Sequence, residues 1–165
     1  MKKIVLVLCL IFSFVLSVPA QKIEVNEKGL FINKQKITKQ TTMAVIDSLI
    51  GKPDRVSLLA NTIWTYDNLG LFIYFANQDS FIKHVSFDLL KRDLQFSPAK
   101  PFKGSLVIHK NRITTVWSLA RLQRIKALKF AEGVSLNPVA YTPNLRLFFE
   151  YDEAKKALRN VGVAL

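Results

Sequence analysis

The first half of the chain alternates apolar and polar positions in short runs, which is typical of β-strands. Residues 30–38 predict a hairpin that turns at Lys34-Gln35. Three later runs keep the same alternation and are separated by turn-forming residues: 62–67, 71–76 and 81–87. We therefore expect these runs to be the strands of an antiparallel sheet.

One segment of this half departs from the two-residue period. Residues 42–50 place apolar side chains at helical spacing after Thr41 or Thr42, either of which suits an N-cap. Gly51 supplies the left-handed residue that often follows a helix, and Pro53 prevents continuation. The predicted order of elements is β-β-α-β-β-β.

The second half repeats the first at a single offset. Residues 29–87 recur, shifted by 76 positions, as residues 105–163 without a gap. The second copy predicts a hairpin at 106–114, a helix at 116–130, and strands at 139–142, 145–151 and 158–163. We therefore predict an α+β fold: a tandem duplication of a β-β-α-β-β-β unit, with antiparallel sheet and one helix per repeat.

The ends and the middle of the chain suggest how the repeats are bounded. Residues 1–20 join Lys2 and Lys3 to an apolar run and a small residue, Ala20, which predicts a secretory signal peptide cleaved after Ala20. The first repeat then covers 21–95 and the second 105–165. Residues 96–104 form a proline-containing linker, and its two phenylalanines indicate that it packs against the body.

Charge is unevenly distributed. The chain carries +12 overall, and +10 remains after the predicted cleavage. Residues 21–80 hold seven basic and six acidic residues, whereas residues 81–165 hold fifteen and six. An acidic protein partner, anionic lipid or nucleic acid would suit this charge, although a solvated surface explains it equally well. Export makes nucleic acid the least expected of the three.

Few residues are available for catalysis or metal binding. The only cysteine, Cys9, lies in the predicted signal peptide, so the mature chain has no disulfide, thiolate metal site or thiol nucleophile. His84 and His109 are far apart and fit no metal-ligand spacing. No nucleophile elbow, phosphate-binding loop or dinucleotide fingerprint occurs. We therefore expect a protein without enzymatic activity, cofactor or metal.

Four aromatic residues and two arginines are the candidate binding residues. Alternation pairs Trp64 with Tyr66 and Phe72 with Tyr74, so all four could share one surface if the strands pair through the turn at 68–70. Aromatic residues with a polar group are enriched in protein interfaces. The alternative is that these rings form the core face. Arg121 and Arg124 belong to the basic second half.

Part of the first repeat resembles a known module. The helix at 42–50, its Gly51-Lys52-Pro53 ending and the strand that carries Trp64 and Tyr66 resemble the SmpA/BamE family of outer-membrane assembly lipoproteins. Two such units in tandem are similar to β-lactamase inhibitory protein, which places a concave sheet over its target. The second repeat lacks both the Gly-x-Pro ending and the Trp-Tyr pair. The resemblance implies a binding module of the cell envelope.

Two functions follow from these observations. The first is an exported, periplasmic or secreted protein that binds an acidic protein stoichiometrically, as an inhibitor or toxin-immunity protein. The alternative is an envelope assembly factor that contacts outer-membrane proteins or anionic lipid.

Overall fold

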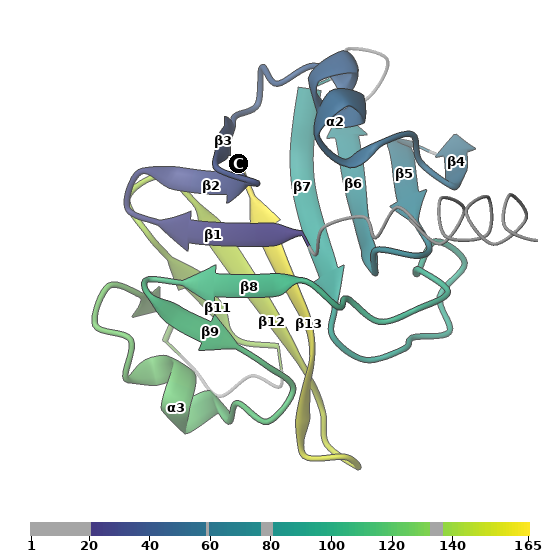
Figure 1. Cartoon of the computed structure of the whole chain (residues 1–165). Helices are drawn as coiled ribbons and strands as arrows, with labels where there is room; N and C mark the ends of the chain where they lie inside the picture. Colours follow the sequence, from purple (N-terminus) through teal and green to yellow (C-terminus); the bar gives the residue numbers. More distant parts are fainter. Residues whose placement is uncertain (1–20, 59, 77–80, 133–136) are drawn as a thin grey trace, which may run out of the picture.

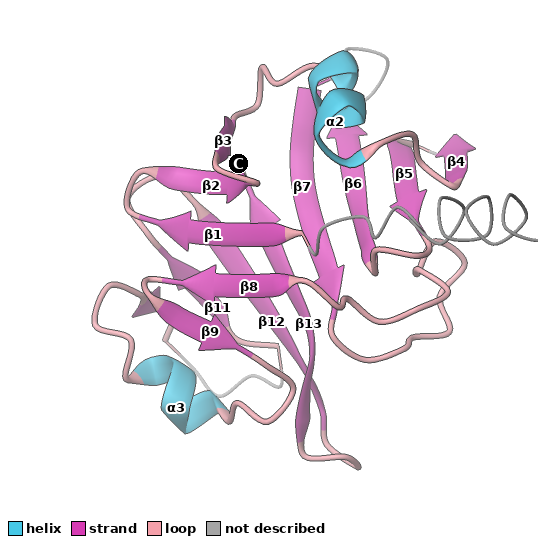
Figure 2. Ribbon diagram, in the orientation of Figure 1, coloured by secondary structure: helices cyan, strands magenta, loops and turns pink. Residues whose placement is uncertain are grey.

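The structure is a computed structural model that describes residues 21–58, 60–76, 81–132 and 137–165. The predicted signal peptide, its cleavage site and the turn expected at 77–80 lie outside the described residues. Figures 1 and 2 show the described elements as two sheets and two short helices.

The smaller sheet has five strands in the order β3-β2-β1-β8-β9. They are β1 (Lys22–Asn26), β2 (Gly29–Ile32), β3 (Gln35–Ile37), β8 (Ser105–Ile108) and β9 (Asn111–Ile113). Strand β1 lies between two hairpins, antiparallel to β2 and parallel to β8. The hairpins turn at Asn33-Lys34 and His109-Lys110, where both residues have positive φ, as a tight two-residue turn requires.

The larger sheet has eight antiparallel strands in the order β10-β11-β12-β13-β7-β6-β5-β4. They are β4 (Arg55–Leu58), β5 (Thr62–Tyr66), β6 (Leu71–Ala76), β7 (Phe81–Asp88), β10 (Lys129–Phe130), β11 (Val139–Tyr141), β12 (Arg146–Asp152) and β13 (Ala157–Ala164). Strands β7 and β13 pair at its centre, with Val85 beside Val163. The two halves of the chain are thus joined by backbone hydrogen bonds in one sheet.

The core lies between the two sheets. In Figure 1 the strands of the smaller sheet cross those of the larger one. Helix α2 (Met43–Ile50) lies at the top of this view and helix α3 (Leu119–Gln123) near the bottom. Ile23 and Ile108 of the smaller sheet are fully buried, as are Ile73 and Val163 of the larger. Each buried aliphatic side chain of this kind stabilises the fold by roughly 1.5–3 kcal/mol. The opposite face of the larger sheet therefore remains outside the main core.

Helix α2 begins and ends where its sequence predicts. The Thr42 hydroxyl accepts a hydrogen bond from the Val45 N–H, and Gly51 has φ of 83° and donates to the Asp47 carbonyl. These contacts satisfy backbone groups that the helix ends leave unpaired. Ile46 on the inner face is fully buried.

The predicted fold class is wrong. Strands make up 46% of the described residues and helices 10%, and the strands form sheets of five and eight. The helix expected over 116–130 has only five residues, and the prediction omits β1 entirely. Some elements do start 76 residues apart, as β7 and β13 do. They do not form α+β units with a helix and a small sheet each, because both sheets contain strands from both halves.

Candidate functional site

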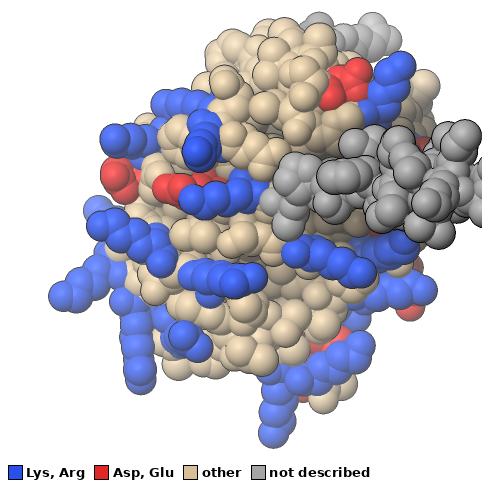
Figure 3. All heavy atoms as spheres, in the orientation of Figure 1, with Lys and Arg blue, Asp and Glu red and all other residues tan. Residues whose placement is uncertain are grey.

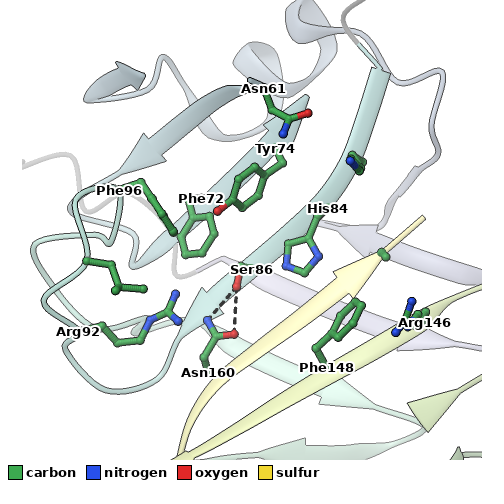
Figure 4. Close-up of a pocket in the computed structure, with 13 residues that line it drawn as sticks. Asn61, Phe72, Tyr74, His84, Ser86, Arg92, Phe96, Arg146, Phe148 and Asn160 are labelled. Carbon is green, nitrogen blue, oxygen red and sulfur yellow. Dashed lines mark hydrogen bonds between the residues drawn. The ribbon is translucent and has the colours of Figure 1, made fainter. Parts of the chain in front are cut away.

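The outer face of the larger sheet, which points away from the smaller sheet, carries a pocket of about 510 Å³ (Figure 4). Strands β6, β7, β12 and β13 supply its floor, and the segment 89–104 between β7 and β8 supplies a wall. Its lining consists of Asn61, Phe72, Tyr74, Lys83, His84, Ser86, Arg92, Leu94, Phe96, Arg146, Phe148, Asn160 and Ala164. This volume lies within the range of ligand pockets.

Strand register arranges the floor in two rows of side chains that run across the sheet. The first row is Tyr74, His84, Ala164 and Arg146, and the second is Phe72, Ser86, Gly162 and Phe148. Residues opposite one another on neighbouring strands project from the same face. Strand β13 contributes only Gly162 and Ala164 to these rows. The His84 ring fills the space over Gly162, so the floor is open over Ala164.

Each aromatic ring of the floor contacts the next ring across the sheet. Centroids are 5.5 Å apart for Phe72 and Tyr74, 5.7 Å for Tyr74 and His84, and 5.6 Å for His84 and Phe148. At the far end, the guanidinium carbon of Arg146 lies 4.7 Å from the Phe148 centroid. These spacings suit edge-to-face and cation–π contacts. The floor is a continuous aromatic surface that ends at an arginine.

The segment 89–104 covers one end of this surface. The Phe96 ring lies 5.4 Å from Phe72 and 5.8 Å from Tyr74, and its carbonyl accepts a hydrogen bond from the Thr65 hydroxyl at 3.0 Å. Arg55 donates to two further carbonyls of the segment, at 3.0 and 2.8 Å. These contacts hold Phe96 in place and leave Phe72 only 2% exposed.

A buried polar network lies below the covered end. Asn160 donates to the Asp88 carboxylate at 2.5 Å, and the Ser86 hydroxyl donates to the Asn160 amide oxygen at 3.1 Å. Arg92 pairs with Asp88 at 2.9 Å and with Glu150 at 2.7 Å. Burial raises the pKa of Asp88, while Arg92 and Asn160 oppose that rise by stabilising the carboxylate. Arg92 therefore has two anionic partners inside the protein.

His84 occupies the middle of the floor as a neutral side chain. Burial, assisted by the nearby Arg92 charge, lowers the pKa of His84 to about 4. Its ring lies over Gly162, where an added Cβ would meet the ring carbon Cε1 at 2.4 Å. Burial also raises the pKa of the neighbouring Tyr74, so its hydroxyl stays protonated. Two neutral groups able to donate hydrogen bonds thus stand in the floor.

The open end of the pocket is positively charged. Arg146 and Lys83 are exposed lining residues, and neither lies within 4.0 Å of a carboxylate in the described part of the chain. The described lining contains no Asp or Glu. An anion that entered would meet uncompensated positive charge beside an aromatic floor.

The structure separates the four aromatic residues proposed from the sequence. Phe72 and Tyr74 belong to the pocket, but Trp64 pairs with Ile73 and Tyr66 with Leu71, which places these two on the core face. Tyr66 is 1% exposed, and burial raises its pKa. The expected four-residue surface is therefore wrong, because the register through the turn opposes each proposed aromatic to an aliphatic or polar residue.

The two proposed arginines lie elsewhere. Arg121 is in α3, with its guanidinium carbon 4.1 Å from the Trp117 ring, and Arg124 caps the same helix. Both are exposed on the side of the smaller sheet. Figure 3 views this side and shows lysines and arginines spread over it, with few acidic residues. This basic surface does not include the pocket.

Sequence reasoning missed most of the pocket. It did not select Arg92, Phe96, Arg146 or Phe148 as site residues, and it considered His84 only as a metal ligand. One available signal was the alignment of Phe72 with Phe148 at the 76-residue offset. The sequence predicts that Phe96, as one of the two phenylalanines of the linker, packs against the body, and it does so against Phe72 and Tyr74. Which rings it would cover depends on how the segment 89–104 folds back, and no local pattern shows that.

The arrangement supports binding. Within the described residues no cluster of three or more His, Cys, Asp or Glu side chains could hold a metal ion. The buried Ser86 hydroxyl is hydrogen-bonded to the Asn160 side-chain amide. In the same residues, no helix has the length and apolar character needed to cross a membrane. The pocket offers contact area, neutral donors and positive charge.

Fold and site together define a mostly β protein of two packed sheets, with a pocket on the outer face of the larger one. The chain belongs to the family described as Domain of unknown function (DUF7738), whose match covers residues 22–120. Neither the curated proteins nor the solved structures contain a match to this chain.

Proposed function

We propose that this protein is an exported, non-enzymatic binding protein that associates stoichiometrically with an acidic protein partner, as an inhibitor or immunity protein does. The observation that carries the proposal is the pocket on the outer sheet face, which combines four aromatic rings and three cations with no carboxylate in its described lining.

The composition of this face suits a protein interface. Aromatic side chains and arginine are the residues that most often dominate binding energy, because they bury large areas at low entropic cost. Phe148 and Tyr74 are only partly buried, so a partner could cover them further. Positive charge on the mature chain would accelerate encounter with an acidic partner.

The test is capture of the partner by mature residues 21–165, compared with two variants. The pocket variant combines Arg146→Gln with Phe148→Ala, and the control is Arg121→Gln on α3, which removes the same charge from a different surface. We expect the wild type and the control to retain one acidic protein in near-equal amount. The pocket variant should retain at least tenfold less. Equal retention by all three proteins would refute the assignment of the interface.

A second candidate rests on the basic surface over the smaller sheet and α3 (Figure 3). If the protein is instead an envelope factor, this surface would contact anionic lipid, and the attraction would weaken with salt. Flotation with phosphatidylglycerol vesicles at physiological salt distinguishes the two candidates, because only the envelope factor should float.

A further inference from the structure

The two ends of the pocket floor are geometrically equivalent but differently covered. Phe72 and Phe148 occupy the outer positions of one row, on either side of Ser86 and Gly162, which pair with each other at the centre of the sheet. Each ring therefore stands one strand away from the central pair, on the same face.

The end that contains Phe72 is filled by the protein itself. The Phe96 ring packs edge-on against Phe72 at 5.4 Å. Arg92 lies 5.5 Å from the Phe72 centroid and is neutralised by Asp88 and Glu150. At this end the sheet face thus holds an inserted phenylalanine beside an arginine that is paired with carboxylates.

The end that contains Phe148 also has an arginine, but in the described chain it has neither a phenylalanine from the segment 89–104 nor a carboxylate paired with that arginine. Arg146 lies 4.7 Å from the Phe148 centroid. It lacks an ion pair within the described chain, and no described ring packs on Phe148 from the segment that connects the sheets. The small residue Ala164 lines the floor beside Arg146, while the His84 ring covers Gly162. His84 already contacts Phe148 from one side at 5.6 Å. Compared with the Phe72 end, this end therefore lacks an inserted ring from outside the sheet, such as Phe96, and a carboxylate beside its arginine.

From this comparison we propose that the open end receives an aromatic side chain with a neighbouring carboxylate, both presented by a polypeptide segment of the partner. The ring packs on Phe148 over Ala164 and beside the His84 ring, which already covers Gly162, as Phe96 packs on Phe72. The carboxylate pairs with Arg146, as Asp88 and Glu150 pair with Arg92. This inference rests on the proposed function and specifies the chemistry of the group that the partner inserts.

Charge-assisted pairing explains why the arginine matters. An arginine held over a ring already has a fixed orientation, so a carboxylate that binds it loses little additional freedom. The ring alone would gain only aromatic contact with Phe148 and His84, which is individually weak. The combination of ring and carboxylate should therefore bind better than either group alone.

A peptide experiment tests the proposal without the natural partner. The probe is acetyl-Gly-Phe-Glu-Gly-amide, added to ¹⁵N-labelled mature protein while amide chemical shifts are followed. We expect saturable shifts at Phe148, Gly162 and Ala164, with an affinity in the millimolar range for so small a ligand. The matched peptides replace Glu with Gln, or Phe with Ala, and each should bind about tenfold more weakly.

Protein variants distinguish binding in the pocket from a general effect of positive charge. Arg146→Gln should weaken the Phe-Glu peptide about tenfold, whereas Arg121→Gln should leave its affinity unchanged. Gly162→Ala keeps the charge but displaces the His84 ring into the hollow, so it should also abolish the shifts. Thermal melting of each variant establishes that it remains folded.

Several results would overturn the proposal. They are an absence of shifts at the open end, equal binding of the Glu and Gln peptides, or shifts centred on Phe72 and Phe96. A failure of the proposed function would give results that differ from a failure of this inference. If the peptide binds at Phe148 but no protein is captured, the chemistry of the site stands and the protein-partner function falls. If a captured partner ignores Arg146→Gln, the function stands and this inference falls.

Discussion

Asn160→Ala tests whether the buried network below the pocket holds the two halves of the large sheet together. The Asn160 amide links β13 to β7 by donating to the Asp88 carboxylate at 2.5 Å and to the Phe87 carbonyl at 3.1 Å. Ser86 donates back to its amide oxygen at 3.1 Å. Ser86 and Asp88 are at most 2% exposed, so water cannot easily replace the lost partner.

The expected loss in the free energy of unfolding follows from these contacts. A hydrogen bond to a charged group contributes roughly 1.5–3 kcal/mol, and a neutral one about 1 kcal/mol. Asp88 keeps its ion pair with Arg92, which reduces the penalty for that carboxylate. We therefore expect Asn160→Ala to lower the free energy of unfolding by about 3 kcal/mol.

Urea denaturation of mature residues 21–165 measures this loss, with Asn144→Ala as the control. The Asn144 amide donates to the Glu27 carbonyl at 2.8 Å, but that bond is exposed, so its removal should cost less than about 1 kcal/mol. The dependence on urea should keep the same slope in both variants. A loss for Asn160→Ala no greater than for Asn144→Ala would show that the network does not stabilise the sheet.

Three further predictions concern other positions. Gly70→Ala should destabilise the protein by about 3 kcal/mol or more, because φ is 73° and the added Cβ would meet backbone at 2.1 Å. Gly51→Ala, with φ of 83° in open space, should cost about 1 kcal/mol in the same urea denaturation assay. His84 should titrate near pH 4 by NMR. Because its pKa is below the unfolded value of about 6.5, the unfolded state binds the proton first, so stability should fall by up to about 3 kcal/mol as pH drops from 6.5 to 4, and His84→Gln should remove that dependence. Arg92→Gln should cost about 3–5 kcal/mol at neutral pH, because it leaves Asp88 buried without its cation; a loss under 1 kcal/mol would contradict the pairing.

Some of the fold could be read from local patterns. The strands expected at 71–76 and 81–87 are β6 (Leu71–Ala76) and β7 (Phe81–Asp88), and the α2 cap residues Thr42 and Gly51 are confirmed. Each of these features depends on neighbouring residues only: alternation for a strand, and a hydroxyl or a glycine for a helix end. Such features can be predicted without knowledge of the rest of the chain.

The second half shows where local patterns fail. The apolar spacing over 116–130 suggests a long helix, yet α3 ends at Gln123 and β10 starts at Lys129. A sequence that suits several short structures takes the one that packs best, and here the larger sheet extends to β10. The long helix predicted for the second repeat is wrong for this reason.

The candidate site could be predicted only in part. Alternation placed Phe72 and Tyr74 on one face and Trp64 and Tyr66 on one face, but the register between β5 and β6 put the two pairs on opposite sides. A shift of one residue in register would have reversed that result, and the turn alone did not determine it.

By itself, therefore, the sequence determined the short-range features of this protein: the strands of the first half other than β1 and β4, the ends of α2, the excess of positive charge and the absence of cysteine from residues 21–165. Only the tertiary structure decided that β7 pairs with β13, that the segment 89–104 folds over Phe72, and that Arg146 lies against Phe148. Those arrangements join residues up to 80 positions apart, as His84 and Ala164 are. No local pattern encodes which distant strand or loop will satisfy a given hydrogen bond or cover a given ring.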